Sequence, residues 1–149
     1  MNVLFVCTGN TCRSQLAEAF AKSAAARRGI SNFTASSAGT NAWDGSPASD
    51  GALLVGMERQ IDLGAHRSRK LTREMVAAAD IVLVMSTAHL ESVRQLGGGG
   101  KVHLIDEYGS DGQSSDGVSD PFGGALDGYR DVADSLQQAI EGMFDRLER

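Results

Sequence analysis

Apolar runs and amphipathic stretches alternate along most of the chain. Residues 2–6 are almost continuously apolar, which is typical of a strand buried on both faces. Residues 125–147 carry apolar side chains at helical spacing, which predicts a long closing helix. The same criteria predict strands over residues 32–37, 80–85 and 101–105, and helices over residues 14–28, 47–58, 72–78 and 87–96.

The segments between these elements predict how the elements are connected. Pro47 suits the first turn of a helix, and Thr72 is a candidate N-cap. We expect irregular loops over residues 41–47 and 61–70, a flexible tip at the glycine run 97–100, and a long polar loop over residues 106–119. Strands that alternate with helices indicate an α/β fold with a parallel sheet, which binds ligands beyond the carboxyl ends of its strands.

Length and charge narrow the possible classes of protein. A chain of 149 residues suits one domain, residues 1–149, with a full hydrophobic core. A net charge of −5 gives no basic footprint for nucleic acid, and no apolar run reaches the ~20 residues of a membrane span. A strand begins directly after Met1, so we expect no signal peptide. We also expect no nucleic-acid or membrane partner, and a monomer.

The two cysteines, with four residues between them, lie in one loop that needs a reduced thiol, which predicts a cytoplasmic protein. No cysteine pair or histidine cluster has the spacing of metal ligands, so we expect neither a metal nor a cofactor.

The first strand runs into a loop that can bind a tetrahedral anion. Cys7 ends the strand, and Arg13 follows six residues later at the start of a helix. Successive N–H groups over residues 8–13 and the positive end of the helix dipole form a concavity for phosphate, and they favour a thiolate at its floor. The guanidinium of Arg13 offers a planar fork to two phosphoryl oxygens. The alternative is an inert core cysteine and a solvated arginine.

A phosphoryl group held by a thiolate still needs a proton donor for its leaving group, and a carboxylic acid suits that step. Asp120 is one of several candidates, and Pro121 holds it in an extended conformation. The long polar loop before it and the helix after it let Asp120 reach over the phosphate loop. The alternative is an ordinary carboxylate at the entry to a helix.

The segment Cys7-Thr8-Gly9-Asn10-Thr11-Cys12-Arg13-Ser14 resembles the phosphate loop of the low-molecular-weight protein tyrosine phosphatases. Threonine at position 11 resembles the bacterial protein-arginine-phosphatase branch of this family most. Three further motifs match in order and spacing: Ser36-Ser37-Ala38-Gly39-Thr40, His66, and Asp120-Pro121-Phe122-Gly123-Gly124. The resemblance implies one three-layer domain, with four strands in the order 2-1-3-4 and helices on both faces. Gln15 departs from it, because the family usually has proline there, and this puts the rigidity of the loop in doubt.

The resemblance also implies roles for individual residues. Cys7, Arg13 and Asp120 match the nucleophile, the phosphate-binding arginine and the general acid. Asn10 and Ser14 can brace the loop through side-chain hydrogen bonds, and Ser37 and His66 match positions that hydrogen-bond the loop. Trp43 and Phe122 match positions on the pocket wall.

Thr11 matches the position that contacts the leaving group in the arginine-directed branch. A hydroxyl there can satisfy a buried polar nitrogen that an aliphatic side chain cannot. The expected activity is therefore a cysteine-dependent phosphatase, through a phosphocysteine intermediate, with protein phosphoarginine as substrate and phosphotyrosine as the alternative.

Other interpretations stay open at this point. Cys12 is either a small buried residue or the partner of a reversible disulfide with Cys7, which would protect the nucleophile from over-oxidation. A thiol-dependent arsenate reductase would need further cysteines after Cys12, and the sequence has none. A phosphate-binding module without turnover would need neither Cys7 nor Asp120. His89 and His103 have no expected role beyond the surface or the core.

Overall fold

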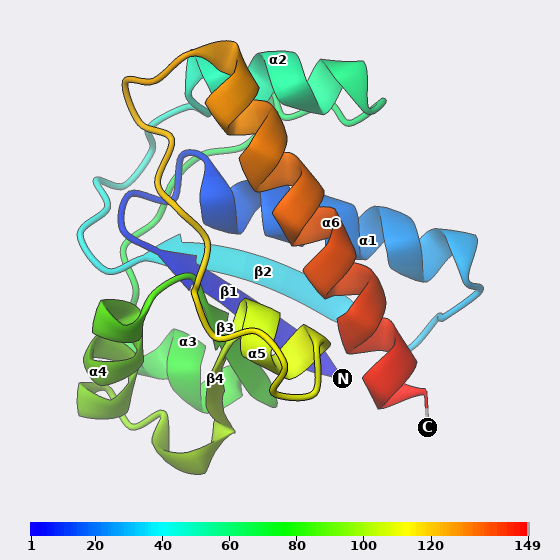
Figure 1. Cartoon of the computed structure of the whole chain (residues 1–149). Coiled ribbons are helices and arrows are strands. Elements are labelled where there is room, and N and C mark those ends of the chain that lie inside the picture. Colours follow the sequence, from blue (N-terminus) through cyan, green and yellow to red (C-terminus); the bar gives the residue numbers. More distant parts are fainter. Residues whose placement is uncertain (149) are drawn as a thin grey trace.

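The computed structural model describes residues 1–148, so the last residue of the predicted domain lies outside the described residues. A four-stranded parallel sheet in the order β2-β1-β3-β4 forms its centre (Figure 1). The strands are β1 (Asn2–Cys7), β2 (Thr34–Gly39), β3 (Ile81–Val84) and β4 (Val102–Leu104). The predicted fold class and strand order are therefore confirmed.

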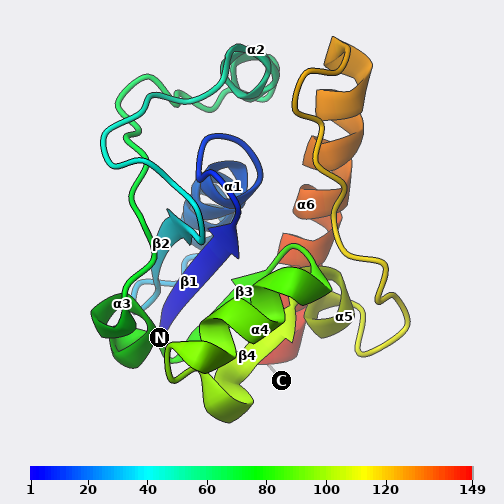
Figure 2. The same ribbon diagram turned by 90° about the vertical axis from the view of Figure 1, so that its left-hand side faces the viewer.

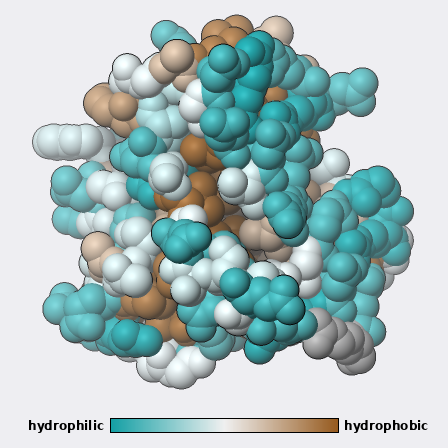
Figure 3. Space-filling model, in the orientation of Figure 1, coloured by the Kyte–Doolittle hydropathy of each residue, from teal (hydrophilic) through white to brown (hydrophobic). Residues whose placement is uncertain are grey.

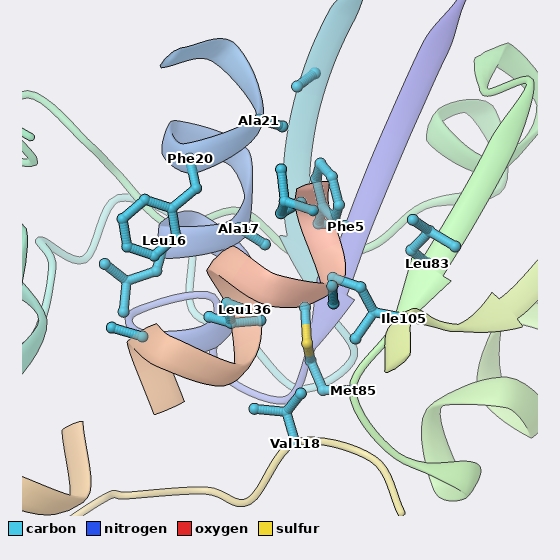
Figure 4. Packing of buried hydrophobic residues seen from close by; sticks show 14 of the residues in the cluster. Phe5, Leu16, Ala17, Phe20, Ala21, Leu83, Met85, Ile105, Val118 and Leu136 are labelled. Atoms are coloured by element: carbon cyan, nitrogen blue, oxygen red, sulfur yellow. The ribbon is translucent and has the colours of Figure 1, made fainter. Parts of the chain in front are cut away.

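Helices cover both faces of the sheet (Figures 1 and 2). Val3 and Phe5 of β1 pack into one core with residues of α1 and α6, and Figure 4 shows Phe5, Leu16, Leu83 and Leu136 within this core. Leu4 and Val6 alternate to the other face, where they pack with residues of α3 and α4. The helices are α1 (Arg13–Arg27), α2 (Asp50–Glu58), α3 (Arg73–Ala78), α4 (Thr87–Gln95), α5 (Ile105–Gly109) and α6 (Leu126–Leu147).

Two predicted boundaries move for local reasons. α2 begins at Asp50 rather than at Pro47, because Ser49 takes the N-cap position and its side chain accepts a hydrogen bond from the N–H of Ala52 at 3.4 Å. β2 begins two residues after the predicted start, and its register pairs Asn2 with Thr34. The predicted cap at Thr72 is confirmed, since its hydroxyl accepts from the N–H of Met75 at 3.2 Å.

Two predicted loops contain regular structure. The beginning of the long polar loop forms α5, whose Ile105 and Tyr108 are buried. The glycine run, for which we expected a flexible tip, forms hydrogen-bonded turns: Gly97, at a φ of +94°, and Gly98 close the end of α4 with hydrogen bonds to Arg94 and Val93. A single 3₁₀ turn over Gly99–Lys101 then leads directly into β4.

The carboxyl end of β1 lies at the end of the sheet nearest to α2 and to the start of α6 (Figure 2).

The surface shown in Figure 3 is mostly hydrophilic, with a narrow apolar band down its middle. Within residues 1–148, none of the helices is long and apolar enough to cross a membrane.

Candidate active site

Residues 7–14 form a tight loop, called the phosphate loop below, around the sulfur of Cys7. Cys7 is 3% exposed, and its Sγ lies 2.9 Å from Oγ of Ser14. The backbone N–H of Asn10 donates to the same sulfur at 3.3 Å. Both groups can donate to a thiolate, and the first turn of α1 begins directly behind them. The loop therefore holds the sulfur in surroundings that suit an anionic nucleophile.

Asn10 braces this loop from inside. It is fully buried and has a φ of +57°, a left-handed conformation that asparagine tolerates better than most residues. Its Nδ2 donates to Oγ of Ser14 at 2.8 Å and to Oγ of Ser37 at 2.9 Å, and its Oδ1 accepts from the N–H of Arg69 at 3.0 Å. Nε2 of His66 donates to the carbonyl of Asn10 at 2.7 Å. The structure thus brings together all four predicted bracing residues.

β2 approaches the loop so closely that only glycine fits at its end. A Cβ on Gly39 would lie 2.4 Å from the carbonyl oxygen of Thr8 and 2.9 Å from the backbone nitrogen of Asn10. The next two N–H groups, of Thr40 and Asn41, donate to the carbonyls of Cys7 and Thr8 at 2.9 Å. This contact explains physically why the motif at residues 36–40 has a glycine.

Arg13 joins the phosphate loop to the segment that carries Asp120. Its side chain is 7% exposed, and its Nη1 donates to the carbonyl of Val118 at 2.9 Å. Its Nη2 lies 3.8 Å from a carboxylate oxygen of Asp120, whose side chain is 55% exposed. The guanidinium is therefore fixed by a neutral carbonyl on one side, and its charge faces the same space as Cys7 and Asp120.

Asp120 begins a tight turn. One of its carboxylate oxygens accepts from the N–H of Phe122, and the N–H of Gly124 donates to the carbonyl of Pro121 at 2.8 Å. Gly123 has a φ of +75°, as the third position of a type II turn requires. The turn holds the carboxylate at the mouth of the pocket rather than in the core.

A cavity of about 230 Å³ opens over the phosphate loop between these groups. Phe122 stands at its mouth with 84% of its surface exposed. Two lining residues, Ser49 and Tyr129, were not predicted from the sequence. A Cβ on Gly51 would lie 2.5 Å from the ring of Tyr129, so this glycine makes room for the aromatic wall. The full lining is Cys7, Thr8, Gly9, Thr11, Cys12, Arg13, Ser49, Asp120, Phe122 and Tyr129.

Trp43 is absent from the residues that line this cavity, contrary to the expectation from the sequence. Its side chain is 83% exposed. Its carbonyl accepts a hydrogen bond from the hydroxyl of Ser68, and nearby the N–H of Gly45 donates to the carbonyl of Ser68. These bonds fix the backbone of the loop and leave the indole in solvent.

Gln15 makes a contact that the usual proline cannot make. Its side chain is buried, and its amide nitrogen donates to the carbonyl of Thr11. The N–H of Ser49 donates to the same carbonyl at 2.9 Å. The amide oxygen of Gln15 has no partner among the described residues. The side chain of Gln15 therefore connects the start of α1 to the loop by a hydrogen bond, where the family usually has the rigid ring of a proline.

Cys12 and His89 complete the surroundings of the loop. Burial raises the pKa of the Cys12 thiol to about 12, with the nearby Cys7 as the second cause, and both cysteines are free. His89, for which the sequence indicated no role, is buried and contacts Oγ1 of Thr8. Among residues 1–148, no group of three or more His, Cys, Asp or Glu side chains could hold a metal ion.

Comparison with known proteins places these features in context. A family model described as low molecular weight phosphotyrosine protein phosphatase matches residues 2–149. The chain is 39% identical over 153 residues to a protein-arginine-phosphatase of Bacillus subtilis (strain 168), with 100% of this chain and 98% of that protein covered. It is 36% identical over 141 residues to a low molecular weight protein-tyrosine-phosphatase of Staphylococcus haemolyticus, with 94% and 95% covered.

A solved structure of a mutant arginine phosphatase with a phosphorylated active-site serine matches with a TM-score of 0.93 and 38% identity. The match covers 100% of this chain and 97% of that chain.

Proposed function

The chain belongs to the low molecular weight phosphotyrosine protein phosphatase family, and we propose that it removes phosphate from phosphoarginine in proteins through a phosphocysteine intermediate. The observation that carries the choice of substrate is Thr11, which lines the pocket together with Cys7, Arg13 and Asp120. Relatives that cover nearly the whole chain include protein-arginine-phosphatases, which supports the same choice.

In the first step the Cys7 thiolate attacks the phosphorus atom in line with the leaving nitrogen. An S–P bond forms and the P–N bond breaks. The N–H groups of the phosphate loop and the guanidinium of Arg13 stabilise the charge on the equatorial oxygens. Asp120, at the pocket mouth, gives its proton to the departing nitrogen, so that neutral or protonated arginine leaves.

In the second step a water molecule attacks the phosphocysteine. Asp120 is now a carboxylate and takes a proton from this water, while the S–P bond breaks and returns the electron pair to Cys7. The products are inorganic phosphate and the original thiolate. Ser14 lies 2.9 Å from the sulfur, and its hydroxyl stabilises the leaving thiolate by donating to it.

The leaving group separates the proposal from its alternative, a phosphotyrosine phosphatase. A phosphoguanidine presents N–H groups next to the phosphorus, and a buried N–H without an acceptor costs about 1–3 kcal/mol. The hydroxyl of Thr11 supplies an acceptor at the pocket wall. The phenolic oxygen of phosphotyrosine has no such N–H group, so that substrate gains nothing from this hydroxyl.

A comparison of kcat/KM on a phosphoarginine peptide and a phosphotyrosine peptide tests the proposal, with Cys7→Ser as the blank. We expect the phosphoarginine peptide to be preferred by at least about tenfold, because one unsatisfied N–H corresponds to that factor. A preference for phosphotyrosine would overturn the choice of substrate and leave the mechanism intact. Equal rates for the wild type and the Cys7→Ser blank on both peptides would overturn the proposal that the protein is a phosphatase.

The proposed setting follows from the chemistry. The substrate is a phosphorylated protein, and the mechanism needs Cys7 as a free thiol or thiolate. Both cysteines are free in the structure, and a reducing compartment such as the cytoplasm keeps them so. A disulfide between Cys7 and Cys12 stays a prediction.

A further inference from the structure

His89 reaches the phosphate loop from the opposite side to α1. It lies in α4, which packs on the face of the sheet opposite α1 (Figure 2). Its ring is buried, with 4% of the residue exposed. Nε2 lies 2.9 Å from Oγ1 of Thr8, and Nδ1 lies 3.2 Å from Oγ of Ser86. A buried ring therefore connects the start of α4 to Thr8, a residue that lines the pocket.

The histidine is neutral wherever the protein is folded near neutral pH. Burial, and then the nearby charge of Arg13, lower its pKa to about 4, while Asp120 has the opposite effect. A neutral imidazole donates through one nitrogen and accepts through the other. The ring therefore donates a hydrogen bond to only one of the two hydroxyl groups, that of Thr8 or that of Ser86. The tautomer of His89 determines which one.

A bound phosphoryl group favours one of the two tautomers. Its oxygens are acceptors, so the hydroxyl of Thr8 gains a charge-assisted hydrogen bond by donating to one of them. This requires Oγ1 of Thr8 to accept from Nε2–H of His89. Nδ1 then accepts from the hydroxyl of Ser86, which makes no capping bond to α4 and is free to donate. The four groups form a chain in which each bond polarises the next.

We propose that His89 is a positioning residue for the reaction, which orients the Thr8 hydroxyl so that its proton is donated to an oxygen of the bound phosphoryl group. This inference rests on the proposed function only in that the pocket binds a phosphoryl group. It concerns the phosphate and not the leaving group. Variants at these positions therefore affect phosphoarginine and phosphotyrosine substrates alike, whereas a change at Thr11 alters their ratio.

Competitive inhibition by inorganic phosphate tests the contact without any leaving group. Thr8→Val removes the hydroxyl at nearly constant volume, and Thr8→Ser keeps it. We expect Thr8→Val to weaken phosphate inhibition about tenfold, the size of a hydrogen bond to a charged group, and Thr8→Ser to restore it. An unchanged inhibition constant for Thr8→Val would overturn the proposal.

Variants at His89 test whether the histidine acts through Thr8. His89→Leu removes both ring nitrogens, and His89→Gln retains a donor that can reach Thr8. We expect His89→Leu to weaken phosphate inhibition by about three- to tenfold, His89→Gln to recover most of it, and the double variant with Thr8→Val to match Thr8→Val alone. Full additivity in the double variant would mean that His89 acts independently of Thr8. The matched control is His103→Leu, at a partly buried histidine outside the pocket.

The ¹⁵N shifts of the imidazole report the tautomer directly, whatever the variants do to folding. With phosphate or vanadate bound to the wild type, we expect the proton of His89 on Nε2. A proton on Nδ1 would overturn the orientation of the chain. If the affinity for phosphate, measured by calorimetric titration, depends on Thr8 but neither peptide is hydrolysed, this inference stands and the proposed function fails. If both peptides are hydrolysed and Thr8→Val leaves the inhibition constant for phosphate unchanged, the proposed function stands and this inference fails.

Discussion

At the scale of single residues, we propose that Thr11 selects the leaving group and that its neighbours bind the phosphate. Thr11→Ile replaces the hydroxyl with an aliphatic group at the same point of the wall. We expect kcat/KM for a phosphoarginine peptide to fall about tenfold or more relative to that for a phosphotyrosine peptide, because the substrate N–H loses its acceptor. The ratio of the two values is measured on one preparation, so loss of active enzyme cancels. An unchanged ratio would show that Thr11 does not select the substrate.

Short-range motifs predicted the residues of the phosphate loop well, and long-range contacts account for the rest. Asn10 and Ser14 within the loop, and Ser37 and His66 beside it, make the bracing hydrogen bonds that the motifs indicated. Tyr129 could not be found in this way, because it enters the pocket only through the packing of α6 against Gly51. His89 is 81 residues from Thr8 in sequence, so no local pattern connects the two.

At the scale of elements, the segment after α5 controls where Asp120 stands. The N–H of Val118 donates to the carbonyl of Met85 at 2.8 Å, and its carbonyl accepts from Arg13. Gly117, at a φ of +77°, passes so close to the residue after β3 that a Cβ would lie 2.6 Å from that same carbonyl of Met85. We expect Gly117→Ala to displace the segment and to lower kcat about tenfold, since a misplacement of about 1 Å can cost more than that.

The control for this prediction lies in the same loop. Gly112 has a φ of +86°, but a Cβ there meets nothing within 4 Å. Gly112→Ala should therefore cost about 1 kcal/mol of stability through backbone strain alone and leave kcat unchanged. Equal losses of kcat in the two variants would show that strain, and not the position of the segment, affects turnover. Rates at saturating substrate, together with urea unfolding, separate these outcomes.

The elements that the sequence predicted least well are those that depend on distant packing. α5 lies in a stretch of polar residues, and it forms because Gly109 and Gly142 let it meet α6 closely: a Cβ on Gly142 would lie 2.0 Å from the carbonyl oxygen of Gly109. By contrast, β1 was predictable from its continuous apolar run, and α1 and α6 were predictable from the helical spacing of their apolar side chains. The periodicity of apolar residues shows which residues of an element are buried, but it does not show which other element packs against them.

At the scale of the whole molecule, the buried neutral His89 links active-site geometry to acid stability. Its folded pKa of about 4 lies below the ordinary value of 6.5. As the pH falls from 6.5 to 4, the unfolded chain takes up a proton at this residue and the folded protein does not, so the free energy of unfolding decreases. Between pH 7 and pH 5 this single group accounts for a loss of about 2 kcal/mol by linkage.

Urea unfolding at pH 7 and pH 5 isolates this effect when the wild type is compared with His89→Gln, whose side chain is neutral throughout. Carboxylates and the other histidines titrate in both proteins and cancel in the difference. We expect the wild type to lose about 2 kcal/mol more than the variant over this interval. Equal losses would mean that His89 is protonated in the folded protein, and the hydrogen-bonded chain to Thr8 would then lack its accepting nitrogen at low pH.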